Sequence, residues 1–108
     1  MVKLTFEEAK ALLDRGTAIA DVREENEYAA DHVENAVNLP LSCLIDVPEA
    51  EGRAFAEEQF PDKSATLIVY CRSGRRSALA AEALERFGYT DIRDMGGLSG
   101  WPYGIAAD

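Results

Sequence analysis

The sequence has few of the residues that build metal sites or disulfide frameworks. Among 108 residues there are two cysteines and one histidine. So few ligands argue against a structural zinc site. Cys43 and Cys71 are 28 positions apart and form neither a CxxC pair nor the disulfide framework of a small secreted domain. We therefore expect no bound metal and no disulfide.

Basic residues are also scarce, because 11 lysines and arginines face 20 acidic residues and give a formal net charge of -9. The first 60 residues hold fourteen acidic and five basic residues, whereas the rest of the chain holds six of each. Nucleic-acid binding relies on a basic surface. We expect no nucleic-acid partner and interpret the acidic half as solvated surface.

Long apolar runs are missing too. No run approaches the roughly 20 residues that a membrane span needs. The first 16 residues are amphipathic and acidic, without the apolar core of a signal peptide. The length suits one hydrophobic core. We therefore expect one domain over residues 1–108, in a cytoplasmic protein that does not bind membranes and acts as a monomer.

What the chain does have is an alternation of helix and strand patterns. A helix is predicted after Thr5, with Glu8 in capping-box spacing and a stop at Gly16. The other expected helices lie within residues 23–32, 49–60 and 75–88. The expected strands are 17–22, 36–41, 65–71 and 90–95. Residues 41–48 look irregular. This order predicts an α/β domain with a mainly parallel sheet. Ligands of such sheets bind beyond the carboxyl ends of the strands, where Cys71 ends the most apolar strand.

The residues after Cys71 indicate an anion site. Arg72, Arg75 and Arg76 would repel one another unless a thiolate on Cys71, an anionic substrate, or both lay between them. The start of a helix favours a thiolate, because backbone N–H groups converge there. Gly74 allows the loop to curl around an anion. A buried structural cysteine is the alternative, but it leaves the arginines unexplained. We therefore interpret Cys71 as a nucleophile.

Three segments together resemble a single-domain rhodanese, a sulfurtransferase. They are "DVREENEYAADHVENAVNLPL" from Asp21, "IVYCRSGRRSALAAEAL" from Ile68 and "GYTDIRDMGGLSGW" from Gly88. The resemblance implies a central, mainly parallel five-stranded sheet with helices on both faces. It also implies that Cys71 is the catalytic residue. Its active-site loop would run from Cys71 to Arg76, so that Arg72, Ser73, Gly74, Arg75 and Arg76 bind substrate and stabilise a persulfide.

The chemistry that the resemblance implies is transfer of sulfur from thiosulfate to cyanide or a thiol through a Cys71 persulfide, without a cofactor. Three alternatives stay open. The domain could relay persulfide sulfur from a protein donor or to a protein acceptor, or it could use mercaptopyruvate, although the arginines argue against that substrate. A rhodanese-like phosphatase or arsenate reductase would need an arginine six positions after Cys71, where this chain has Ser77.

Five further residues have two interpretations each. Asp21 and Arg23 match a family signature and could brace the catalytic loop, with Asp21 accepting loop hydrogen bonds; otherwise Asp21 caps a helix and Arg23 forms a surface ion pair. His32 is expected to be structural rather than a catalytic base. Cys43 is expected to pack as a small apolar residue rather than to resolve the persulfide. Trp101 either lines the mouth of the site or caps the core.

Overall fold

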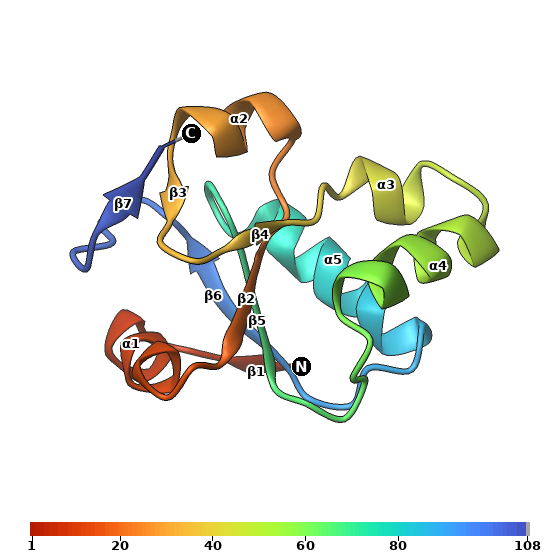
Figure 1. Ribbon diagram of the computed structural model, residues 1–108, viewed down its shortest axis with the longest axis horizontal. Coiled ribbons are helices and arrows are strands. Elements are labelled where there is room, and N and C mark those ends of the chain that lie inside the picture. The colour runs from red at the N-terminus through yellow and green to blue at the C-terminus, as the bar shows by residue number, and fades with distance from the viewer. Residues whose placement is uncertain (108) are drawn as a thin grey trace.

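A parallel sheet of five strands forms the centre of the molecule. The computed structural model describes residues 1–107. The strands are β1 (Val2–Lys3), β2 (Ala18–Asp21), β4 (Val37–Asn38), β5 (Leu67–Cys71) and β6 (Ile92–Gly97). Their order is β1-β6-β5-β2-β4, and every neighbouring pair is parallel (Figure 1). All residues of β5, the central strand, are buried, as its continuous apolar sequence predicts. The expected α/β class and parallel sheet are confirmed.

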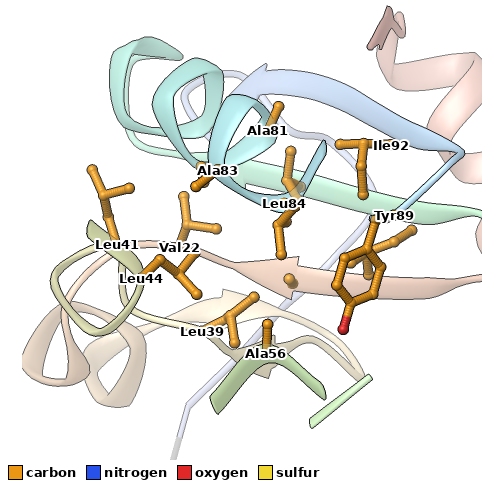
Figure 2. Packing of buried hydrophobic residues seen from close by; sticks show 14 of the residues in the cluster. Val22, Leu39, Leu41, Leu44, Ala56, Ala81, Ala83, Leu84, Tyr89 and Ile92 are labelled. Atoms are coloured by element: carbon orange, nitrogen blue, oxygen red, sulfur yellow. The ribbon is translucent and has the colours of Figure 1, made fainter. Parts of the chain in front are cut away.

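Helices cover both faces of this sheet. On one face lie α3 (Ser42–Ile45), α4 (Glu49–Gln59) and α5 (Arg75–Arg86); on the other lie α1 (Phe6–Asp14) and α2 (Glu25–Ala30). Figure 2 shows how Leu84 of α5 packs toward Ile92 of β6, while Leu44 and Ala56 approach the sheet from α3 and α4. The two layers of buried side chains hold the carboxyl end of β5 at a fixed position.

The signals at the helix ends act as the sequence predicts. The backbone N–H of Glu8 donates to Thr5 Oγ1 at 3.1 Å, and that of Thr5 donates to Glu8 Oε1 at 2.8 Å, which completes the capping box. After α5 the chain turns at Gly88, whose φ of +102° is accessible to glycine at little cost. These local rules fix α1 and α5, the helices that flank β6 on opposite faces.

Some short elements differ from the expectation. Residues 41–48 are not wholly irregular, because α3 forms there. Leu44 of α3 is buried, and a Cβ atom on Gly52 would lie 2.4 Å from its carbonyl oxygen, so tertiary packing against α4 stabilises this helix. The strands β1, β3 (His32–Val33) and β7 (Ile105–Ala106) were not predicted, since two residues show no periodicity. β3 and β7 form a separate antiparallel pair. Within residues 1–107, every helix is too short or too polar to cross a membrane.

Candidate active site

Cys71 lies at the junction of β5 and the loop that leads into α5. Its side chain is a free thiol and is fully buried. The backbone N–H of Gly74 donates to Sγ of Cys71 at 3.0 Å. Gly74 is the N-cap of α5, with φ of +96°, and gives the helix no side-chain cap. Because the first N–H groups of a helix have no partner within the helix, this sulfur lies at an electropositive backbone terminus.

The loop after Cys71 packs directly on two glycines of β6. A Cβ atom on Gly97 would lie 2.4 Å from the carbonyl oxygen of Arg72 and 3.1 Å from Cα of Ser73. A Cβ atom on Gly74 would lie 3.5 Å from Cα of Gly96. Any side chain at position 97 would therefore displace the loop. Sequence analysis gave Gly97 no role, although adjacent glycines in a strand often mark a close backbone approach.

The three arginines of the loop differ in their partners. Arg76 forms two charge-assisted hydrogen bonds to Glu27 of α2, with distances of 2.6 Å (Nη1 to Oε1) and 3.0 Å (Nη2 to Oε2). The hydrogen bond from Arg76 lowers the pKa of Glu27 to about 2, and the same bond raises the pKa of Arg76. A thiolate or a substrate is thus not needed to explain Arg76. A carboxylate of the protein is its partner, and a role of Arg76 toward substrate or persulfide stays a prediction.

Arg72 and Arg75 differ from Arg76. Both are exposed, as is Ser73 between them, and neither arginine has an ion-pair partner within residues 1–107. They are the loop cations that remain available to an anion from solution. The structure therefore divides the arginine cluster into one member that pairs with Glu27 and two that have no ion-pair partner in the described part of the chain.

Asp21 and Arg23 form a buried ion pair beside the strand that ends at Cys71. Nη2 of Arg23 lies 2.7 Å from Oδ2 of Asp21, and both side chains are at most 1% exposed. The hydroxyl of Tyr70, the residue before Cys71, donates to the same oxygen at 2.7 Å. Burial and this contact to Asp21 raise the pKa of Tyr70. Burial alone would lower the pKa of Arg23, but its hydrogen bond to Asp21 and the charge of that carboxylate outweigh burial and raise it.

These contacts correct both readings of the pair. Arg23 is not a surface residue, and the N-cap of α2 is Glu24 rather than Asp21. The hydrogen bonds that the Asp21 carboxylate accepts come from Arg23 and Tyr70, not from residues 72–76. The pair therefore holds the end of β5 through Tyr70. Arg23 also donates to Asp31, with 3.2 Å between Nη1 and Oδ1 and a second bond from Nη2 to the Asp31 carbonyl oxygen.

The structure also shows the surroundings of His32, Cys43 and Trp101. His32 is buried and stacks on the ring of Tyr28 at 3.9 Å, with Nδ1 2.7 Å from the Tyr28 carbonyl oxygen. Cys43 is a partly buried free thiol on α3. Trp101 meets Phe6 edge to face at 5.3 Å and packs on the buried cluster, and it also faces a hollow beside Arg72. Residues 1–107 contain no group of three or more potential metal ligands.

Comparison with known proteins identifies the family. Residues 5–102 match the model of the rhodanese-like domain, and the chain therefore belongs to the rhodanese-like domain family. It is 41% identical over 78 residues to thiosulfate sulfurtransferase PspE of Escherichia coli, a match that covers 72% of this chain and 67% of that protein. It is 31% identical over 94 residues to the thiosulfate:glutathione sulfurtransferase of Saccharomyces cerevisiae, which covers 81% of this chain and 67% of the relative. Such relatives support a rhodanese-type sulfurtransferase.

A solved structure agrees with this assignment. The structure described as "rhodanese with anions from E. coli" superposes with a TM-score of 0.70 at 33% sequence identity, covering 85% of this chain and 99% of that one. The resemblance inferred from the sequence is thereby confirmed at the level of family and fold.

Proposed function

We propose that the protein is a thiosulfate sulfurtransferase in which Cys71 is the nucleophile and carries the transferred sulfur as a persulfide. The observation that carries the proposal is the position of Cys71 Sγ at the start of α5, where the Gly74 N–H donates to it at 3.0 Å. A backbone donor at a helix N-terminus stabilises a thiolate, the reactive form of cysteine. The family match and the names of the relatives support the same reaction class.

In the first half-reaction, the Cys71 thiolate attacks the outer sulfur of thiosulfate. A new bond forms between Sγ and that sulfur, the sulfur–sulfur bond of thiosulfate breaks, and sulfite leaves with the bonding electrons. Arg72 and Arg75 attract the dianion, and the amides of residues 72–76 stabilise negative charge on the persulfide. Because Cys71 is fully buried, the loop has to move before the sulfur and thiosulfate can meet.

In the second half-reaction, a thiolate or cyanide attacks the outer sulfur of the persulfide. The bond between this sulfur and Sγ breaks, its electrons return to Cys71 as a thiolate, and the acceptor leaves as a persulfide or as thiocyanate. A thiol acceptor first releases its proton to solvent. The reaction uses no cofactor. We propose a cytoplasmic, monomeric enzyme that acts on small molecules.

The experiment is intact-protein mass spectrometry after incubation with thiosulfate. Wild type and Cys43→Ser should gain the mass of one sulfur atom and lose it when cyanide is added, whereas Cys71→Ser should gain nothing. Cys43→Ser is a matched control, because Cys43 is the second free thiol of the chain. Labelling of the Cys71→Ser protein would overturn the assignment. No labelling of wild type by thiosulfate, together with labelling by a persulfide-bearing protein, would instead indicate a relay domain.

A further inference from the structure

A hollow of about 260 Å³ lies next to the catalytic loop. Asp31, Arg72, Leu98, Ser99, Trp101 and Ile105 line it. Two of these residues are connected directly to Cys71. Arg72 follows it in the chain, and the backbone N–H of Leu98 donates to the Cys71 carbonyl oxygen at 2.8 Å. A molecule in this hollow would thus sit beside the residue that carries the persulfide in the proposed function.

The lining combines one cation, one anion and an apolar wall. Arg72 is exposed and has no ion-pair partner within residues 1–107. Asp31 is held by Arg23 at its Oδ1 atom, yet its side chain remains 51% exposed. Leu98, Trp101 and Ile105 supply the apolar part. Charges of both signs suit a ligand that carries both signs, and the apolar side chains suit short methylene groups.

The size of the hollow argues for a small ligand. Its volume is below the range of about 300–1,000 Å³ typical of sites for drug-sized molecules. A stable protein partner would instead cover about 800 Å² of surface on each side. A ligand that carries an ammonium group, a carboxylate and a thiol on a few carbon atoms fits these limits.

We infer that this hollow binds the sulfur acceptor, and that the acceptor is a low-molecular-weight thiol of the amino-acid class. Arg72 binds its carboxylate and Asp31 its ammonium group, which directs the thiol toward the Cys71 persulfide. This inference rests on the proposed function, because it assigns the acceptor of the second half-reaction. Sulfur moves as described above, with the acceptor thiolate attacking the outer sulfur and Cys71 leaving as a thiolate.

The test measures the second half-reaction alone. Each variant is loaded with sulfur by inorganic polysulfide and desalted, so that thiosulfate binding does not enter the comparison. Loss of the added sulfur mass is then followed with four thiols: cysteine carries both charges, cysteine ethyl ester the ammonium group only, N-acetylcysteine the carboxylate only, and 2-mercaptoethanol neither. Comparing each thiol between variants cancels its intrinsic reactivity.

Arg72→Gln should slow discharge by cysteine and N-acetylcysteine about tenfold and leave the ester and 2-mercaptoethanol unchanged. Asp31→Asn should slow discharge by cysteine and its ester by about threefold, less than tenfold because the carboxylate is half exposed and already faces Arg23. Arg86→Gln is the matched control, since Arg86 is an exposed arginine of α5 that neither lines the hollow nor belongs to the loop after Cys71, and it should give wild-type rates.

The outcomes separate the two proposals. Equal effects of Arg72→Gln on all four thiols, or equal effects of Arg72→Gln and Arg86→Gln, would overturn the acceptor site while leaving sulfur transfer intact. A wild-type protein that takes up no sulfur from polysulfide or thiosulfate would overturn the proposed function, and the acceptor site with it. Arg72→Glu gives a second check, because it should reverse the preference for N-acetylcysteine over the ester relative to wild type.

Discussion

Glu27 and Arg76 are 49 positions apart in the sequence and form a bidentate ion pair that joins α2 to the first turn of α5. The two side chains are 25% and 31% exposed, so water screens the pair only in part. Glu27 also accepts a hydrogen bond from the backbone N–H of Glu24, which fixes its position on α2. The last residue of the loop that follows Cys71 is therefore anchored to a helix from the other face of the sheet.

Glu27→Gln should reduce the free energy of unfolding by about 1 kcal/mol, because it removes the charge that pairs with Arg76. Urea denaturation of Glu27→Gln, Arg76→Gln and the double variant gives the coupling between the two residues. Glu49→Gln is the control, since Glu49 pairs with Arg86 where both side chains are more than half exposed. Strictly additive losses from the two single variants would show that the pair does not stabilise the protein.

The Glu27–Arg76 pair also predicts how the stability of the protein depends on pH. The hydrogen bond from Arg76 lowers the pKa of Glu27 to about 2 from an ordinary value of 4.5. The stabilisation that ionised Glu27 gives to the folded state is therefore complete above pH 4.5 and is lost as the pH falls toward 2. The difference in unfolding free energy between wild type and Glu27→Gln should shrink by about 1 kcal/mol over this interval. A constant difference from pH 6 to pH 2 would contradict the assigned shift.

Much of the fold could be predicted because it follows local rules. The capping box at Thr5 and Glu8, the apolar run of β5 and the glycine after α5 each act within a few residues. The position of Cys71 at the end of the central strand follows from the same patterns. The strands β1, β3 and β7 and the short helix α3 could not be predicted, because packing against distant segments stabilises them.

The candidate site, too, could be predicted only in part. The loop could be found in the sequence. The pairing of Arg76 with Glu27 and the burial of Arg23 against Asp21 could not, since both depend on how α2 and β5 are placed. The sequence made Cys71 a candidate nucleophile, but the complete burial of Cys71 could not be found from it. A cluster of like charges in a sequence does not show which of its members already have partners in the fold.

Gly97→Ala should impair sulfur transfer more than its effect on stability explains. A methyl group at this position would lie 2.4 Å from the carbonyl oxygen of Arg72 and would push the loop away from β6. Gly52→Ala is a matched control, because its methyl group would also lie 2.4 Å from a carbonyl oxygen, that of Leu44, outside the catalytic loop. The measurements are thiosulfate turnover and urea denaturation of both variants.

Both substitutions are expected to destabilise the protein, but only Gly97→Ala should lower turnover under conditions where the variant is fully folded. We expect a loss of at least tenfold, since misplaced catalytic groups reduce rates steeply. Equal turnover by the two folded variants would show that the contact between Gly97 and the loop is not needed for the reaction.

Thiosulfate turnover should fall as ionic strength rises. The protein carries a net charge of -9, so the attraction of a dianion has to come from Arg72 and Arg75 close to Cys71. Such attraction is screened over about 8–10 Å at physiological salt. The double variant Arg72→Gln/Arg75→Gln should lower kcat/KM at low salt and remove most of its salt dependence.

The double variant Arg53→Gln/Arg86→Gln is the control for this experiment. It removes the same total charge from partly or fully exposed residues of α4 and α5 that pair with Glu49. If overall charge set the salt dependence, both double variants would change it equally. We expect the control to keep the wild-type slope, because Coulomb attraction at this range depends on distance from the reacting sulfur. Identical slopes in all three proteins would show that the unpaired arginines of the loop do not attract the substrate.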